Sequence, residues 1–179
     1  KKIFNLKKRP KNNPLIVHYD NLSQLKKDCN LNKNFLLLYN KFCPGPLTFI
    51  LKLKKNSKIS KIVTNNKKIL AVRFPKQGLF KKLIKNLDYP LAAPSANISN
   101  KLSSVKASDV KEEFGNKIKF VLDGGKCKVG IESTIISLVK KPEILRLGGL
   151  ENSKIKKVLN KPIIININPN KKNAPGQSK

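Results

Sequence analysis

Arginine is rare in this basic chain, and its rarity draws attention to three positions. Of the 39 lysines and arginines, only Arg9, Arg73 and Arg146 are arginines. A guanidinium is planar, stays charged and can donate two parallel hydrogen bonds to a phosphate or carboxylate, which a lysine ammonium cannot do. One of the three could serve an ordinary ion pair, but together they predict a site for an anion. A phosphate-bearing substrate such as a nucleotide fits this chemistry.

Five short segments combine turn residues with hydrogen-bonding groups beside expected strands. Segment 7–14 carries cations and amides on a backbone stiffened by prolines, which suits a polyphosphate, although a basic surface loop looks the same. The small-residue turn 94–99 is typical of both anion-binding turns and helix caps. Segment 130–136 places three polar side chains before an apolar strand, where burial without a function would be costly. Segments 71–75 and 144–149 each contain an arginine at the end of a strand.

The other reactive side chains are few. His18 is the sole histidine, and a lone histidine at a strand end is more often structural than catalytic. No phosphate-loop or dinucleotide-binding glycine pattern occurs. Among the sparse carboxylates, only Asp123 and Glu132 lie in motif-like segments. This scarcity argues against a metal cage built by the protein and favours Mg²⁺ carried on substrate phosphates.

The cysteines and the apolar segments indicate the cellular compartment of the protein and whether it enters a membrane. Cys29, Cys43 and Cys127 are odd in number and lack metal-binding spacing, which predicts reduced thiols in a cytoplasmic protein without zinc. No apolar stretch approaches the ~20 residues that a membrane span requires. We therefore expect no membrane association.

The formal net charge of +29 is extreme. Such a charge attracts polyanions and favours RNA or DNA through counterion release. Lysine, asparagine and isoleucine are all abundant, however, which is also what an AT-rich coding sequence produces. Solvated surface lysines therefore explain the charge as well as a nucleic-acid partner does.

Strands and short helices alternate along the chain, which indicates an α/β fold, and 179 residues suffice for one well-packed domain. The patterns predict strands at residues 14–18, 48–53, 69–74, 91–93, 119–122, 134–139, 143–146 and 163–167. They predict helices at residues 21–29, 79–87, 109–114 and 153–159. The apolar runs Phe35–Tyr39 and Ile163–Ile165 have the length of buried strands. Asp109 and Glu112 are spaced like a capping box. The tail 168–179 is typical of a linker or a disordered end.

Read in order, eight segments over residues 7–149 resemble the Sua5/YciO/YrdC family. They are Lys7-x-Arg9-Pro10-x-x-Asn13-Pro14-Leu15, His18, Pro44-Gly45-Pro46-Leu47-Thr48, Val72-Arg73-Phe74-Pro75, Pro94-Ser95-Ala96-Asn97, Asp123-Gly124-Gly125, Glu132-Ser133-Thr134-Ile135 and Leu145-Arg146. The resemblance implies a twisted mixed sheet flanked by helices, YrdC/RibB-like, around a basic central cleft. It also implies synthesis of threonylcarbamoyl-AMP and pyrophosphate from L-threonine, bicarbonate and ATP with Mg²⁺, for the t6A modification of tRNA.

The resemblance also assigns roles to individual residues. For ATP and its phosphates it implies Lys7, Arg9, Asn13, Asn97 and Arg146, with Ser104 as a weaker candidate. For L-threonine it implies His18, Arg73, Ser95 and Ser133, with Thr134 as a weaker candidate. Arg73 would pair with the carboxylate of threonine. No protein nucleophile or base is implied.

The resemblance is incomplete at both ends. The family begins with a segment like Pro-Thr-Glu-Thr-Val-Tyr-Gly-Leu, and nothing like it precedes Lys1. We therefore expect residues 1–167 to be a catalytic domain that lacks its N-terminal part, and residues 168–179 to begin a linker to a second domain. Other t6A-pathway proteins would be its partners. The alternatives are an RNA-, tRNA- or ribosome-binding module without this chemistry, and a YciO-type paralogue with another small-molecule reaction.

Overall fold

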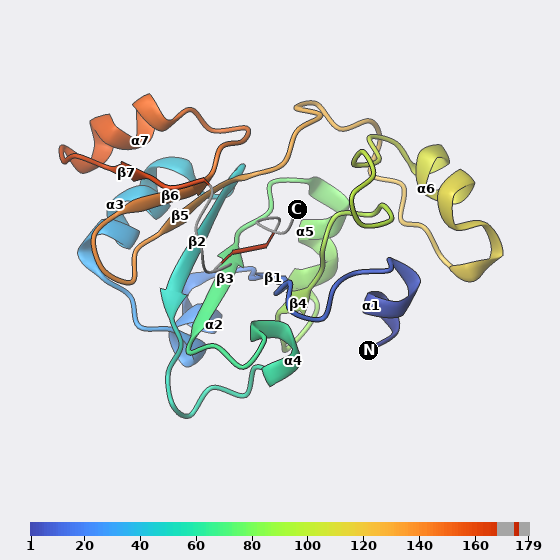
Figure 1. The fold of residues 1–179 in the computed structure, drawn as a ribbon, viewed down its shortest axis with the longest axis horizontal. Coiled ribbons are helices and arrows are strands. Elements are labelled where there is room, and N and C mark those ends of the chain that lie inside the picture. The colour runs from blue at the N-terminus through green and yellow to red at the C-terminus, as the bar shows by residue number, and fades with distance from the viewer. Residues whose placement is uncertain (168–173, 176–179) are drawn as a thin grey trace.

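The computed structural model describes residues 1–167 and 174–175, and it confirms an α/β fold built on one mixed sheet (Figure 1). Within these residues, seven strands follow the spatial order β4-β1-β3-β2-β5-β6-β7. Neighbours are parallel in the pairs β1/β3, β2/β5 and β6/β7, and antiparallel in the other three. The strands are β1 (Ile16–His18), β2 (Leu47–Lys52), β3 (Ile69–Arg73), β4 (Leu91–Ala92), β5 (Thr134–Ser137), β6 (Glu143–Arg146) and β7 (Ile164–Ile165).

Helices fill most of the connections between the strands. They are α1 (Lys2–Leu6), α2 (Leu22–Asp28), α3 (Lys33–Phe42), α4 (Lys61–Thr64), α5 (Gly78–Lys85), α6 (Ala107–Phe114) and α7 (Asn152–Leu159), with a short 3₁₀ helix at Gly115–Lys117. Asparagine side chains cap two of them. The Oδ1 atom of Asn21 accepts from the Gln24 amide at 3.0 Å, and that of Asn32 accepts from the Phe35 amide at 2.9 Å. None of the described helices has the length and apolar character needed to span a membrane.

The sheet separates two clusters of buried side chains. Strand residues such as Val17, Phe49 and Val72 pack with α2, α3 and α7 into the larger cluster. Their sequence neighbours point to the opposite face because side chains alternate along a strand. There a smaller cluster joins residues of five strands with one residue of the tail: Ile16, Ile50, Ala71, Ile135, Leu145 and Ala174. The opposite face is therefore less thickly covered, and it is the face that carries the polar residues described below.

Two predicted strands are wrong. Phe35–Tyr39 lies in α3, where Phe35 and Leu38 are buried while Leu36 and Leu37 are exposed, so its apolar side chains follow helical periodicity. Residues 119–122 form no strand. Phe120 is 91% exposed and Leu122 is 58% exposed, and no described strand lies beside them to supply hydrogen bonds.

Smaller differences concern ends and edges. The predicted strand at 163–167 is reduced to β7, at the edge of the sheet, where Ile164 and Ile165 are exposed rather than buried. The capping box predicted between Asp109 and Glu112 does not form, because α6 begins two residues earlier and Asp109 is its third residue. From that position the Asp109 carboxylate accepts from the N-cap amide of Lys106 at 3.2 Å, as the acidic residue of a capping box does, and from the Val105 amide at 3.0 Å. The patterns did not predict α1, α3 or α4.

The predicted linker falls mostly outside the described residues, which omit 168–173 and 176–179. Ala174 and Pro175 are described, and both are buried. Ala174 is 1% exposed within the smaller apolar cluster. This part of the tail therefore packs against the sheet.

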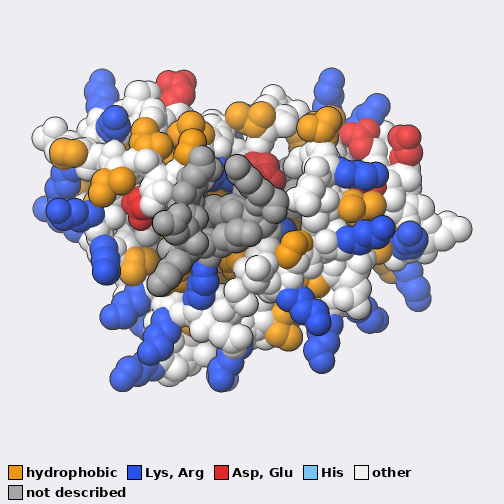
Figure 2. All heavy atoms as spheres, viewed as in Figure 1, with side chains coloured by type: hydrophobic (Ala, Val, Ile, Leu, Met, Phe, Trp, Pro, Cys, Tyr) orange, Lys and Arg blue, Asp and Glu red, His pale blue; other side chains and the backbone are white. Residues whose placement is uncertain are grey.

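Basic side chains are widely distributed over the visible face of the molecule. Figure 2 shows Lys and Arg side chains around its whole margin, with few acidic side chains among them. This distribution is typical of solvated surface lysines. The basic central cleft stays a prediction.

Candidate active site

The central strands place three of the polar residues in one row. In the sheet register Arg73, which ends β3, lies between His18 of β1 and Thr48 of β2. All three follow or precede residues of the larger cluster, so their side chains lie on the less covered face. The register of β2 with β5 continues the row toward Ser133, which immediately precedes β5. One end of the sheet thus presents polar groups beside an otherwise apolar face.

Two hydroxyl groups and one arginine meet at the end of this row. The Oγ1 atom of Thr48 and the Oγ atom of Ser133 lie 2.7 Å apart, and both residues are buried. The Nη2 atom of Arg146, at the end of β6, donates to the Ser133 carbonyl at 2.8 Å and to its hydroxyl at 3.2 Å. The Nε atom of Arg146 donates to the same carbonyl at 3.1 Å. The Arg146 side chain is therefore held in a fixed orientation.

Arg9 is fixed by the loop that follows it. Its Nη2 atom donates to Asn13 Oδ1 and to the Pro14 carbonyl, both at 2.7 Å, and its Nε atom donates to the Asn13 carbonyl at 3.2 Å. Asn13 is itself buried. The predicted segment 7–14 is therefore an ordered loop that orients its guanidinium.

Lys7 joins this loop to the turn 94–99. Its Nζ atom donates to the Ser95 carbonyl at 2.5 Å and also to the Asn97 carbonyl. The Lys7 carbonyl accepts from the Ser99 amide at 2.8 Å. Burial, reinforced by the charge of Arg9, lowers the pKa of the Lys7 ammonium to about 8. Two segments separated by about ninety residues are thus brought into one site.

Asn97 leaves one acceptor free. Its Nδ2 atom donates to the Ile98 carbonyl at 3.0 Å and to the Lys101 carbonyl at 2.7 Å. Its Oδ1 atom is buried and finds no partner among the described residues. Ser104 supports the same turn by donating its hydroxyl to the Ala96 carbonyl at 2.6 Å. A buried acceptor without a partner is costly unless a ligand supplies a donor.

Glu132 is the carboxylate that couples the three arginines electrostatically. It forms an ion pair with Arg146. Burial lowers the pKa of each guanidinium, while the charge of Glu132 opposes that shift at all three. The charge of Arg146 lowers the pKa of both Arg9 and Arg73 further. Arg146 therefore lies close enough to repel both Arg9 and Arg73, and the exposed Glu132 carboxylate acts on all three arginines, which is the electrostatics expected of an anion site.

His18 is buried beside this cationic group. Burial and the charge of Arg73 lower the pKa of its imidazole to about 4, against a weaker opposing effect of the Leu91 carbonyl. Its Nδ1 atom lies 3.4 Å from that carbonyl, and its ring packs edge-on against Phe80 with the centroids 5.2 Å apart. The imidazole is therefore neutral at physiological pH, and Nδ1 is placed to donate while Nε2 accepts.

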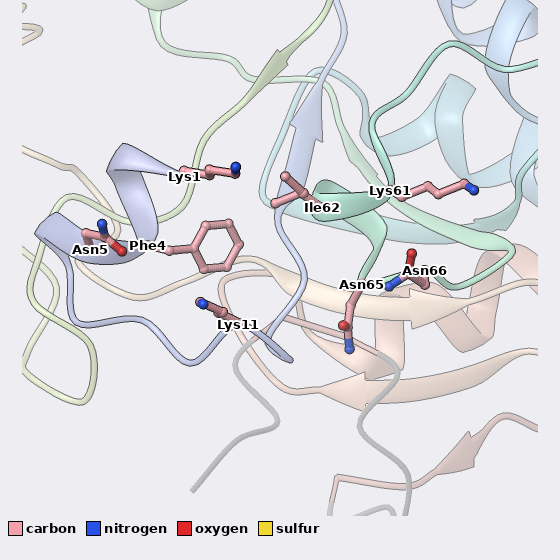
Figure 3. A pocket seen from close by; sticks show the side chains of 8 residues that line it. All are labelled: Lys1, Phe4, Asn5, Lys11, Lys61, Ile62, Asn65 and Asn66. Atoms are coloured by element: carbon pink, nitrogen blue, oxygen red, sulfur yellow. The ribbon is translucent and has the colours of Figure 1, made fainter.

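A hollow of about 470 Å³ lies elsewhere, between α1 and α4 (Figure 3). The ring of Phe4 points across it toward Ile62, and lysine and asparagine side chains complete the lining. The lining contains none of the three arginines and none of the other predicted site residues. The arginine cluster, not this hollow, is the candidate site.

Comparison with known proteins agrees with the geometry. A family model named Sua5_yciO_yrdC and described as "Telomere recombination" matches residues 1–148. The chain belongs to the Sua5/YciO/YrdC family. Two relatives, both named threonylcarbamoyl-AMP synthase, support the assignment. One from Pyrococcus abyssi (strain GE5 / Orsay) is 40% identical over 89% of this chain, and one from Schizosaccharomyces pombe (strain 972 / ATCC 24843) is 39% identical over 86%.

Solved structures of this family share the fold. Pyrococcus abyssi Sua5 complexed with L-threonine matches 99% of this chain with a TM-score of 0.93 and 37% identity. Escherichia coli YciO matches 84% of the chain with a TM-score of 0.73 at 20% identity, which concerns the fold alone. The chain covers 47% of the Pyrococcus relative, 43% of the Schizosaccharomyces relative and 54% of the Sua5 structure. It spans about half the length of these proteins.

Most of the predicted residues come together in the structure of this family member, but two differ in how they contribute. Thr134 directs its hydroxyl at the backbone of Leu150, donating to its carbonyl at 2.6 Å and accepting from its amide at 3.1 Å. Ser95 is exposed, and it is its carbonyl that holds Lys7. The roles of these residues toward ligands stay predictions.

Three residues of the site were not assigned a role from the sequence: Thr48, Phe80 and Glu132. Thr48 lies in a quoted motif, and its place at the start of a strand was the available signal. Glu132 was noted only as a carboxylate in a motif-like segment. Phe80 lay in a predicted amphipathic helix, and nothing in the pattern distinguished a ring that contacts His18 from one that fills the core.

Proposed function

We propose that the protein of this chain is an L-threonylcarbamoyladenylate synthase. It would make threonylcarbamoyl-AMP and pyrophosphate from L-threonine, bicarbonate and ATP, as the intermediate for t6A modification of tRNA. The observation that carries the proposal is the convergence of Arg9, Arg73 and Arg146 around Glu132 in a chain 40% identical to a named synthase. The alternative of an RNA-binding module without chemistry is not favoured by these relatives.

Different arginines would bind different substrates. Arg73 would pair with the carboxylate of L-threonine, next to His18 in the sheet. The neutral His18 would accept a hydrogen bond from the hydroxyl or amino group of the same substrate. Arg9, held by the loop before β1, and Arg146, at the end of β6, would bind the phosphates of ATP, and Lys7, Asn13 and Asn97 would hold the surrounding loop. Magnesium would enter as part of the MgATP substrate.

The reaction requires charge neutralisation more than a protein nucleophile. The amino nitrogen of threonine forms a C–N bond with the carbon of bicarbonate, and water is lost, giving a carbamate. A carbamate oxygen then attacks the α-phosphorus of ATP, and the bond to the bridging oxygen of pyrophosphate breaks. Fixed guanidinium groups lower the barrier by holding the two anions together and by stabilising the charge that builds up on the phosphate.

The test is pyrophosphate release by the full natural protein. Release is expected only when L-threonine and bicarbonate are both present with MgATP, and the nucleotide product should be threonylcarbamoyl-AMP by mass spectrometry. Equal release in the absence of L-threonine would overturn the proposal. L-Serine in place of L-threonine serves as a control for amino-acid selection.

A further inference from the structure

The hydroxyl pair of Thr48 and Ser133 has an unusual property: both residues are almost completely buried, yet they lie inside a polar site. Thr48 is 0% exposed and Ser133 is 2% exposed. The two residues are 85 positions apart in sequence, and their hydroxyl oxygens lie 2.7 Å apart. Each hydroxyl has one hydrogen to donate and two lone pairs to accept. Because the pair is buried, a hydroxyl hydrogen that points away from an acceptor would cost free energy.

The environment of Thr48 determines which hydroxyl donates. Among the described residues, Ser133 Oγ is the hydrogen-bond partner recorded for Thr48 Oγ1. If Ser133 donated to Thr48, the Thr48 hydrogen would be buried without an acceptor, which is unfavourable. If Thr48 donates instead, the hydrogen left without a protein acceptor among the described residues is that of Ser133. Ser133 contacts Arg146 and Thr48 does not, so an anion bound at Arg146 would reach the Ser133 hydrogen. With such an anion bound, the arrangement that satisfies both hydroxyl groups has Thr48 donating to Ser133.

The remaining lone pair of Ser133 is also occupied. Arg146 Nη2 donates to Ser133 Oγ at 3.2 Å. With Thr48 and Arg146 both donating, the acceptors of Ser133 are filled, and its own hydrogen is left for another group. Ser133 follows Thr48 in the row that contains Arg73, and it is bonded to Arg146, so cations lie on both sides of it. The group that it can bind is therefore an anionic oxygen.

We propose that Thr48 is a positioning residue that makes the Ser133 hydroxyl an obligate donor to an anionic oxygen of the bound substrate. The inference rests on the proposed function, which brings two such oxygens to the site. One belongs to the carboxylate of L-threonine and the other to a phosphate of ATP. Thr48 itself does not touch the substrate and acts through Ser133.

The test is calorimetric titration of the full natural protein with L-threonine and, separately, with MgATP. Thr48→Val keeps the shape of the side chain and removes the hydroxyl. It should weaken binding of one ligand by about 10-fold, which corresponds to ~1.4 kcal/mol. A loss confined to L-threonine identifies the carboxylate, and a loss confined to MgATP identifies a phosphate. Thr48→Ser restores the hydroxyl and should return the affinity to within about 3-fold of the original.

Two further measurements separate positioning from a general loss of structure. Thr64→Val is a matched control: this buried threonine, on α4, donates to the Lys61 carbonyl at 3.3 Å and lies outside the site. Its affinities should equal those of the unchanged protein. In a Ser133→Ala background, Thr48→Val should weaken binding no further, because Thr48 acts through the missing hydroxyl.

The outcomes are distinct. If Thr48→Val binds both ligands as tightly as the unchanged protein, the inference is wrong while the proposed function stands. If Thr48→Val and Ser133→Ala weaken binding additively, Thr48 does not act through Ser133, and the inference is again wrong. If the unchanged protein binds neither ligand, the proposed function fails and the inference fails with it.

Discussion

One carboxylate, Glu132, offsets part of the positive charge of the candidate site. Glu132 lies at the ion pair with Arg146 and also acts on Arg9 and Arg73. Three partly buried guanidinium groups with one exposed counter-charge leave a net positive centre that an anion would neutralise. The scarcity of arginine in this lysine-rich sequence therefore corresponds to a geometric need. Lysine suffices at the surface, whereas the site uses the planar fork.

Arg146→Lys tests that need. Lysine keeps the charge but cannot reproduce the hydrogen bonds that Nε and Nη2 make to the Ser133 carbonyl. We expect the dissociation constant for ATP to rise at least about 10-fold, with the affinity for L-threonine changed less. Arg73→Lys is the matched variant and should show the opposite pattern. The same pattern in both variants, measured by calorimetry, would contradict the proposed division of the two arginines.

His18 predicts a pH dependence of stability. Its pKa falls to about 4 in the folded protein, whereas an unfolded histidine titrates near 6.5. Between these values the unfolded chain binds the proton and the folded protein does not, so the free energy of unfolding decreases as the pH falls from about 6.5 toward 4. Urea unfolding of the unchanged protein and of His18→Gln at pH 7, 6 and 5 checks this. The variant should lose less stability over that range, and identical pH slopes would show that His18 is not responsible.

At the scale of elements, the turn after β6 is packed tightly against residues 132–134, which lead into β5. A Cβ atom on Gly148 would lie 2.3 Å from the Glu132 carbonyl oxygen and 2.5 Å from the Ser133 carbonyl carbon. Both contacts are backbone atoms, which cannot move without displacing the site. The turn therefore sets the distance between Arg146 and its partners.

Gly148→Ala is expected to weaken binding of both ATP and L-threonine by about 10-fold or more, because it displaces the 132–134 backbone that both sides of the site share. The melting temperature should fall as well. Gly78→Ala is the control, since a Cβ there meets nothing within 4 Å. Undiminished affinity in Gly148→Ala would mean that the turn can shift without disturbing Ser133.

The sequence predicts elements well where a short strand or an amphipathic helix is isolated by turn residues. It predicted β6 to the residue, and β2, β3 and α7 to within one or two residues. It failed at α3, because a run of five apolar residues fits a buried strand and a buried helix equally. It also failed at 119–122, because a strand exists only when a neighbour pairs with it, and pairing is not a local property. For the same reason the contact between Thr48 and Ser133 could not be predicted, because it depends on the parallel pairing of β2 with β5.

For the whole molecule, the sheet separates two functions. One face is covered by α2, α3 and α7 and carries the larger apolar cluster. The other face holds a smaller apolar cluster next to the polar row formed by His18, Arg73 and Thr48. Figure 1 places α1 and α6 on the side of the molecule away from α3 and α7, so the loops that carry Lys7 and Asn97 approach from there. The larger apolar cluster and the candidate anion site thus lie on different faces of the same strands.

The long sequence separation of the contacts has a consequence for synthesis on the ribosome. The bonds of Lys7 to residues 95 and 97 can form only after those residues have been translated. The contact of Thr48 with Ser133 likewise requires that Ser133 has been translated. Contacts of such long range require large loops to close and are made late in folding. The candidate site is therefore incomplete on a nascent chain until Ser133 and Arg146 have been translated. The last residue of the candidate site, Arg146, is translated after six of the seven described strands are complete or nearly so.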